Sequence, residues 1–225
     1  MTAQGGAPAH RATAGLVLLH GRGAAAHGMI NFAEGLALPE VAMIAPEAPD
    51  RSWWPTSFMA PMEALGPWLE PALEAVDRAV SALTCAGLPR ASISVCGFSQ
   101  GACLALEYAA RSGLGLSAVF AFTGGLLGTA DADGAPTPAL YGFTPKRFDY
   151  DGRLDGLHMD MSCHDRDPHI PLARFHESEK VLRHLGARVT ARIEPGAIHS
   201  ITEGDVVALR SHLNVPPEAS TAQRR

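Results

Sequence analysis

Residues 93–111 read ISVCGFSQGACLALEYAAR, and this stretch decides the fold class. It begins as an apolar run of strand type, passes through Gly97-Phe98-Ser99-Gln100-Gly101, and continues with apolar residues at helical spacing. A Gly-x-Ser-x-Gly pattern between a strand and a helix is typical of a sharp corner that exposes a serine hydroxyl. The glycines let the two backbones approach closely, and the free N–H groups of the helix N-terminus point at the same place. We therefore predict that Ser99 is a nucleophile rather than a helix cap.

The segments on both sides of this corner alternate between strand-like runs and helical patterns. Such alternation predicts an α/β fold with a mostly parallel sheet flanked by helices, here the α/β-hydrolase fold. Residues 124–156 have no periodicity, so we expect a lid-like excursion or a pocket wall there. Pro67 and Pro71 should make the first turns of one helix irregular. The strands are expected at 15–20, 41–46, 91–96, 117–122, 157–163 and 187–193, and the helices at 29–38, 62–86, 99–111, 171–185 and 201–213.

Length and charge narrow the class of protein. The 225 residues suit one domain, expected over 15–213, between a flexible N-terminus (1–14) and a flexible C-terminal tail (214–225). A net charge of −5 without any block of Lys or Arg argues against nucleic acid as a partner. No apolar run has the length of a signal peptide or a membrane span, so we expect a cytoplasmic protein without stable membrane insertion. The sequence is compatible with a homodimer.

A serine nucleophile needs a base and an acid. In the α/β-hydrolase fold both follow the serine along the chain, first the acid and then the histidine. His199 stands in a glycine-flanked turn after the last expected strand, and is the best candidate for the base. Asp165 and Asp167 both follow the strand at 157–163, at the sheet edge where catalytic groups gather. Asp167 is favoured because Pro168 holds it in an extended backbone. We predict a triad in which His199 accepts the serine proton and Asp167 orients the imidazole.

Two other kinds of chemistry are compatible with residues of this region. His164, Asp165, Asp167 and His169 have side chains that suit zinc or manganese. No further metal-binding motif completes this cluster, so we expect neither a metal nor another cofactor. Cys103 lies one helical turn after Ser99 and could be a thiol nucleophile, although helix packing explains it better. All four cysteines are interpreted as free thiols, mostly buried.

The segment HGRG after the first expected strand predicts a second main-chain donor for the site. The backbone N–H of Arg22 should lie beside that of Gln100, and the two together would form an oxyanion hole. Two roles fit the Arg22 side chain equally well: it binds an anionic part of the substrate, or it points to solvent. Trp53, Trp54 and Phe58 follow the second strand and are expected to form an apolar pocket wall, with core packing as the alternative.

With these motifs in order, the chain resembles the phospholipase/carboxylesterase family, the relatives of acyl-protein thioesterases and lysophospholipases. The resemblance implies a metal-free hydrolase with the triad and oxyanion hole named above, acting on short or medium acyl or aryl carboxylic esters. The chain departs from the thioesterase branch, since it reads RGAAAH where LGDS is usual. A small-molecule ester is therefore the expected partner, with thioester or lysophospholipid hydrolysis, or a non-catalytic ligand-binding module, as alternatives. The resemblance rests on Leu19 to Gly23, Gly97 to Ala102, Asp167 to Pro171 and Gly196 to His199.

Overall fold

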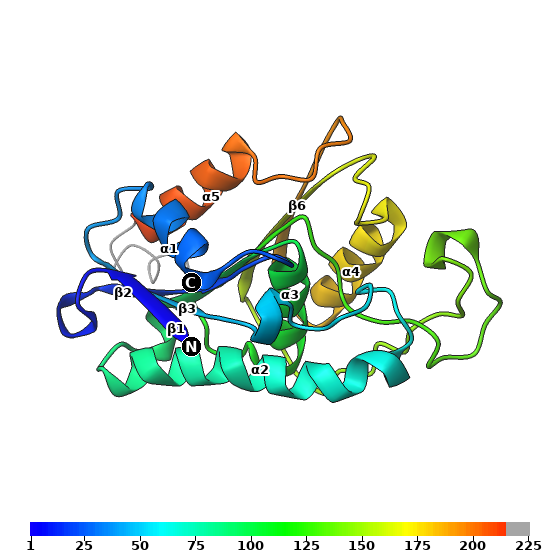
Figure 1. Ribbon diagram of the computed structural model, residues 1–225, viewed down its shortest axis with the longest axis horizontal. Helices are drawn as coiled ribbons and strands as arrows, with labels where there is room; N and C mark the ends of the chain where they lie inside the picture. Colours follow the sequence, from blue (N-terminus) through cyan, green and yellow to red (C-terminus); the bar gives the residue numbers. More distant parts are fainter. Residues whose placement is uncertain (215–225) are drawn as a thin grey trace.

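The computed structural model describes residues 1–214 and shows one twisted sheet with helices on both faces (Figure 1). Its seven strands lie in the order β1-β3-β2-β4-β5-β6-β7. All neighbouring pairs are parallel except β1 with β3, which confirms the predicted fold class. The strands are β1 (Thr2–Gly6), β2 (Ala14–Leu19), β3 (Val41–Pro46), β4 (Ile93–Phe98), β5 (Ala118–Phe122), β6 (His158–His164) and β7 (Arg188–Glu194).

Alternate strand residues feed two separate hydrophobic cores, one on each face of the sheet. Val95 and Val119 belong to the core that α2, α3 and α4 cover, whereas Cys96 and Phe120 belong to the core under α1 and α5 (Figure 1). Burial on both faces explains why these strands read as continuous apolar runs rather than alternating ones. The helices are α1 (Ala26–Glu34), α2 (Met62–Cys85), α3 (Gln100–Ser112), α4 (Leu172–His184) and α5 (Glu203–Leu213).

The parallel strands place their carboxyl ends along one edge of the sheet. Leu19 at the end of β2 is paired with Gly97 of β4, and His164 at the end of β6 is paired with Glu194 of β7. The segments that leave these strands therefore start from the same edge, as the general rule for ligand sites in open α/β sheets requires.

The N-terminus differs from our expectation of a flexible segment over 1–14. Strand β1 pairs antiparallel with β3, from Thr2 opposite Pro46 to Gly6 opposite Ala42. At Gly6 a Cβ atom would lie 2.2 Å from the carbonyl oxygen of Val41, so the close approach of β1 depends on glycine. The expected tail at 214–225 lies, except for Asn214, outside the described residues.

Helix α2 also differs from expectation, because it continues without a break through Pro67 and Pro71. Each proline removes one backbone donor, but Leu65 and Leu69 of the same turns are buried in the core and hold the helix on the sheet. Within residues 1–214, no helix combines the length and the apolar character that crossing a bilayer requires.

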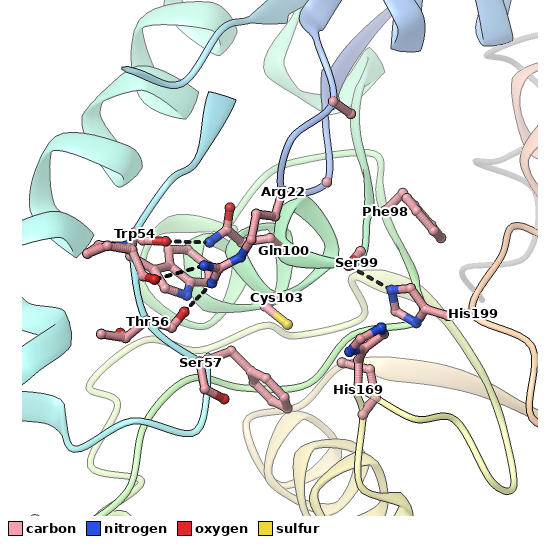
Figure 2. Close-up of a pocket in the computed structure, with 15 residues that line it drawn as sticks. Arg22, Trp54, Thr56, Ser57, Phe98, Ser99, Gln100, Cys103, His169 and His199 are labelled. Carbon is pink, nitrogen blue, oxygen red and sulfur yellow. Dashed lines mark hydrogen bonds between the residues drawn. The ribbon is translucent and has the colours of Figure 1, made fainter. Parts of the chain in front are cut away.

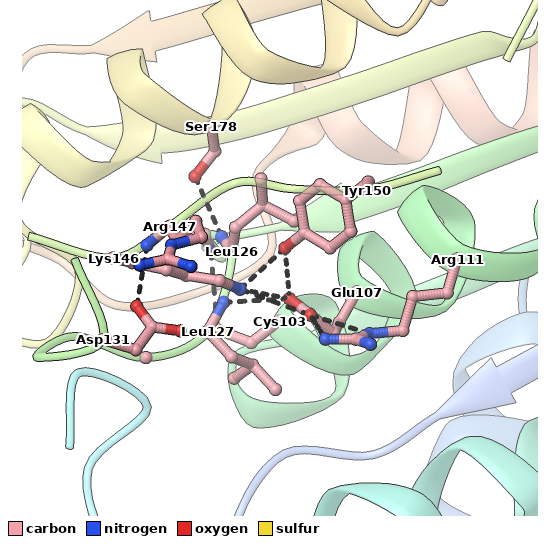
Figure 3. Close-up of polar contacts among 12 residues, drawn as sticks. Cys103, Glu107, Arg111, Leu126, Leu127, Asp131, Lys146, Arg147, Tyr150 and Ser178 are labelled. Atoms are coloured by element: carbon pink, nitrogen blue, oxygen red, sulfur yellow. Dashed lines mark hydrogen bonds and ion pairs between the residues drawn. The ribbon is translucent and has the colours of Figure 1, made fainter. Parts of the chain in front are cut away.

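The excursion between β5 and β6 is held to α3 by one buried carboxylate, that of Glu107 (Figure 3). Glu107 Oε2 accepts hydrogen bonds from the N–H of Leu127 at 3.2 Å and from the hydroxyl of Tyr150 at 2.9 Å. Its carboxylate also pairs with Lys146 at 3.2 Å and with Arg111 at 2.7 Å. Burial acts to raise the pKa of Glu107, but the two cations outweigh it and lower the pKa. Both ends of the excursion are thus fixed to the helix that follows Ser99.

Candidate active site

Ser99 stands on the corner between β4 and α3 in a backbone conformation that residues other than glycine rarely adopt, with φ 56° and ψ −119°. Its own N–H donates to the carbonyl of Phe122 in β5 at 3.0 Å. A Cβ atom at Gly97 would lie 2.1 Å from the carbonyl oxygen of Gly101, and one at Gly101 would lie 2.2 Å from that of Leu19. Both glycines of the motif are therefore required by backbone packing, and the corner holds the Ser99 side chain away from the sheet.

The structure brings together the three side chains that the sequence singled out. His199 Nε2 lies 2.7 Å from Ser99 Oγ, the contact drawn as a dashed line in Figure 2. His199 Nδ1 lies 2.8 Å from Asp167 Oδ2 and 3.1 Å from Asp167 Oδ1. A proton on Nδ1 directed at the carboxylate leaves Nε2 free to accept the proton of the serine hydroxyl.

The surroundings of Asp167 favour its ionised form. The carboxylate is buried, and Oδ1 accepts hydrogen bonds from the N–H of His169 at 2.8 Å and of Ile170 at 3.0 Å. Burial acts to raise the pKa of Asp167, but the hydrogen bonds from His199 and from these two amides lower it overall. Asp165 instead accepts from the N–H of Gly196 at 2.8 Å, and so fixes the turn that leads to His199.

Two aromatic rings flank the imidazole of His199. The Phe98 ring lies 5.3 Å from it, and the His169 ring lies 4.7 Å from it in an edge-on arrangement with an interplanar angle of 75°. Sequence reasoning assigned no role to Phe98 and considered His169 only as a metal ligand. The sequence contains a signal for both residues, because Phe98 is the variable residue before Ser99 and His169 stands two residues after Asp167.

A buried histidine holds the loop that follows β2. His20 Nε2 accepts the N–H of Ala48 at 3.1 Å, so its proton is assigned to Nδ1, which donates to the carbonyl of Gly21 at 2.8 Å. Burial lowers the pKa of His20, which keeps the ring neutral in this role. The indole N–H of Trp53 donates to the carbonyl of His20 at 2.9 Å. The loop is therefore fixed from both sides.

The two main-chain N–H groups proposed as oxyanion donors, those of Arg22 and Gln100, lie beside Ser99. Among the groups of residues 1–214, none accepts the main-chain N–H of Arg22 or of Gln100, and both residues line the cavity at Ser99. These N–H groups remain available to an oxygen atom of a substrate.

A cavity of about 510 Å³ opens next to Ser99 and His199. Trp54 and Phe58 line it as expected, whereas Trp53 does not, because its ring packs beneath the loop against His20 at 5.1 Å. No residue of 124–156 lines this cavity, so the excursion does not form the expected pocket wall. The wall is formed by 54–58, and the other lining residues are Gly21, Arg22, Ala24, Phe98, Ser99, Gln100, Cys103, His169, Ile170 and His199.

Cys103 also lies against the cavity, between Ser99 and the wall segment (Figure 2), and not only in the helix packing that we expected. Burial raises the pKa of its thiol to about 12, although the N–H of Gly125 donates to its sulfur at 3.5 Å. A thiol that stays protonated is a poor nucleophile, so Cys103 contributes shape and apolar surface.

The side chains of Arg22 and Gln100 hold the cavity wall in place. Arg22 donates from Nη1 to the carbonyl of Pro55 at 2.8 Å and from Nη2 to the carbonyl of Thr56. The Gln100 amide accepts the N–H of Trp53 at 2.9 Å and donates to the carbonyl of Trp54 at 2.8 Å. The Arg22 side chain is exposed, and these hydrogen bonds hold it against the wall segment.

The metal hypothesis for the cluster His164, Asp165, Asp167 and His169 finds no support in the geometry. Within residues 1–214, no three His, Cys, Asp or Glu side chains are placed to hold a metal ion together. Asp165 and Asp167 use their carboxylates on the backbone and on His199 instead. All four cysteines are free thiols, of which Cys85 is exposed and the other three are buried.

A mostly parallel sheet with a serine on the strand-to-helix corner and a histidine and an aspartate at the same sheet edge defines an α/β-hydrolase. The chain belongs to the phospholipase/carboxylesterase family, since residues 6–140, more than half of its length, match the family described as Phospholipase/Carboxylesterase. A phospholipase/carboxylesterase from Dyadobacter fermentans shares 34% identity over 94% of this chain and 95% of its own, with a TM-score of 0.82. Esterase PE8 shares 23% identity over 94% and 96% of the two chains, with a TM-score of 0.71. The Bacillus cereus carboxylesterase shares 18% identity over 95% and 92%, with a TM-score of 0.68.

Proposed function

We propose that this protein is a serine carboxylesterase that hydrolyses short or medium acyl or aryl esters through an acyl-serine intermediate. The observation that carries the proposal is the continuous hydrogen-bonded chain from Ser99 Oγ through the imidazole of His199 to the carboxylate of Asp167. Membership of the phospholipase/carboxylesterase family supports the choice of an ester bond as the target.

In the first half of the reaction, Ser99 Oγ attacks the ester carbonyl while its proton passes to His199 Nε2. The ionised Asp167 stabilises the imidazolium that results. The carbonyl oxygen becomes an oxyanion, which the free main-chain N–H groups of Arg22 and Gln100 would receive. The imidazolium then gives its proton to the departing alkoxide, and the alcohol leaves an acyl group on Ser99.

In the second half, water takes the place of the alcohol. His199 removes a proton from the water as it attacks the acyl carbonyl, and the same main-chain donors receive the oxyanion again. Collapse of the intermediate returns the proton to Ser99 and releases the carboxylic acid. The wall of the cavity beside Ser99 includes Trp54 and Phe58, which suits a short acyl chain or an aryl group.

A chromogenic short-chain ester tests the proposal, with Ser99→Ala expected to remove turnover. Ser81→Ala is the matched control, because it makes the same chemical change at an exposed position of α2. Turnover by purified Ser99→Ala at the rate of the wild type would contradict the proposal.

Two alternatives are separated by further measurements on the same protein. Comparing kcat/KM for simple esters, thioesters and lysophospholipids distinguishes a carboxylesterase from a thioesterase or lysophospholipase. A fluorophosphonate probe distinguishes a hydrolase from a non-catalytic ligand-binding module, because it labels only an activated serine. We expect labelling of the wild type and of Ser81→Ala, and none of Ser99→Ala.

A further inference from the structure

The cavity is lined by an exposed cation without a counter-ion. Arg22 lines it, and no Asp or Glu is among its lining residues. Within residues 1–214 the Arg22 guanidinium forms no ion pair. The protein as a whole carries a net charge of −5, so this positive site runs against the overall charge. A charged group that faces a binding cavity without an internal partner is suited to a ligand of opposite charge.

The guanidinium is held in a defined position. Its two hydrogen bonds to the carbonyls of Pro55 and Thr56 fix it against the wall segment, but carbonyl groups are neutral and leave the positive charge unbalanced. A guanidinium also has more N–H groups than these two bonds use. Such a fixed cation loses little conformational entropy when it binds a carboxylate.

The wall segment also contains an unsatisfied donor, which is shielded from solvent. The indole N–H of Trp54 is buried and has no hydrogen-bond partner within the described residues. Buried N–H groups without partners are rare in folded proteins. Figure 2 shows Trp54 and Arg22 on one side of the cavity, with Ser99 and His199 on the other and Cys103 between them. The wall opposite the nucleophile therefore presents the Arg22 cation and has no anion.

From these observations we infer that the natural substrate is an ester whose acyl half carries a carboxylate, which Arg22 binds while the ester carbonyl lies at Ser99. This inference rests on the proposed ester hydrolysis and adds the substrate class, the monoesters of short dicarboxylic acids. The reaction releases the alcohol and the free dicarboxylic acid. Arg22 is then a specificity-determining residue through its side chain, in addition to the role of its main-chain N–H.

The test compares two substrates of the same shape that differ in charge, monomethyl glutarate and its neutral terminal amide. Methanol release by the wild-type protein gives kcat/KM for each. We expect the carboxylate substrate to be preferred by about tenfold or more, which is the size of a charge-assisted hydrogen bond. The preference should shrink as salt is added, because screening weakens the attraction to Arg22.

Two variants identify the residue responsible. Arg22→Gln removes the charge and Arg22→Lys keeps it, and both disturb the contacts to 55–56. Because either change can lower the overall rate, the measured quantity is the ratio of the two kcat/KM values within each variant. We expect the ratio to fall to about 1 in Arg22→Gln and to stay well above 1 in Arg22→Lys.

The wild-type measurement keeps the inference falsifiable even if a variant fails to fold. Equal hydrolysis of both substrates, or preference for the amide, by a wild type that cleaves esters through Ser99 would overturn the anionic subsite and leave the esterase proposal intact. A wild type that cleaves no ester at all would instead contradict the proposed function. A preference that persists in Arg22→Gln would overturn the assignment to Arg22.

Discussion

Replacing Glu107 by glutamine should destabilise the protein strongly, because it leaves a buried ammonium without its counter-ion. The side chains of Glu107 and Lys146 have exposed fractions of 0% and 2%. Glutamine keeps the shape, and its amide oxygen can still accept the hydrogen bonds of Leu127 and Tyr150. Its amide nitrogen then faces the donors of Arg111 and Lys146, so the change removes both the charge and an acceptor. Removing one partner of a buried ion pair typically costs about 3–5 kcal/mol of unfolding free energy. Arg111 loses a partner too, but its side chain is 39% exposed and can turn toward water.

Urea unfolding followed by the fluorescence of the buried Trp53 and Trp54 measures this loss. With a slope of about 3 kcal/mol per molar urea, the midpoint should fall by about 1–1.7 M. The double variant Glu107→Gln/Lys146→Met removes both charges and should recover about 1–3 kcal/mol relative to Glu107→Gln. Ester hydrolysis by folded Glu107→Gln should stay within about threefold of the wild type, since 124–156 does not line the cavity. A loss below about 1 kcal/mol, or no recovery in the double variant, would refute the reasoning.

Three further outcomes follow from the site and from α5. Asp167→Asn should lower kcat by about 10⁴-fold, because asparagine favours the wrong tautomer of the neighbouring imidazole. Asp165→Asn is the control. An equal loss of kcat in Asp165→Asn would contradict the assignment of Asp167 as the acid of the triad. Cys103→Ala should keep kcat/KM for a short ester within about tenfold, whereas complete inactivity with normal folding would reveal a role for the thiol in the chemistry. Burial, helped by the nearby His158, lowers the pKa of His212 to about 4. Because this folded pKa is below the unfolded value of about 6.5, the unfolded chain takes up the proton first. Stability is complete above pH 6.5 and falls between pH 6.5 and 4, by about 3 kcal/mol. His212→Gln should flatten that slope in unfolding measurements, and an unchanged slope would rule out His212 as its source.

The parts of the molecule that sequence reasoning predicted correctly are those that leave a local mark. The central strands are buried on both faces and read as apolar runs, and the corner at Ser99 needs glycine at fixed offsets. Chain order placed the acid and the histidine after Ser99, and Pro168 and the glycine-flanked turn favoured Asp167 and His199, whose side chains lie within hydrogen-bond distance of one another and of Ser99 in the structure. Their convergence follows from parallel strands, which bring carboxyl ends far apart in the chain to one edge of the sheet.

What the sequence did not reveal depends on pairings between distant segments. The residues TAQGG of β1 have no apolar alternation, and only β3 gives them a partner. Glu107 and Lys146 are 39 positions apart, and either would be interpreted as a surface charge on its own. The acceptors of Arg22 are main-chain carbonyls, which any residue type supplies. For the same reason, the sequence did not show whether residues 54–58 or the excursion at 124–156 line the cavity.

The antiparallel strand β1 matters for handling this protein in the laboratory. It covers the outer edge of β3, and the N–H of Glu47 donates to the carbonyl of Met1 at 3.0 Å. A version shortened by its first six residues would leave the outer edge of β3 unpaired, and open strand edges attract other chains. Deletion of this segment should therefore promote aggregation before it affects catalysis, and an affinity tag placed ahead of Thr2 would be joined to a strand of the sheet rather than to a loose end.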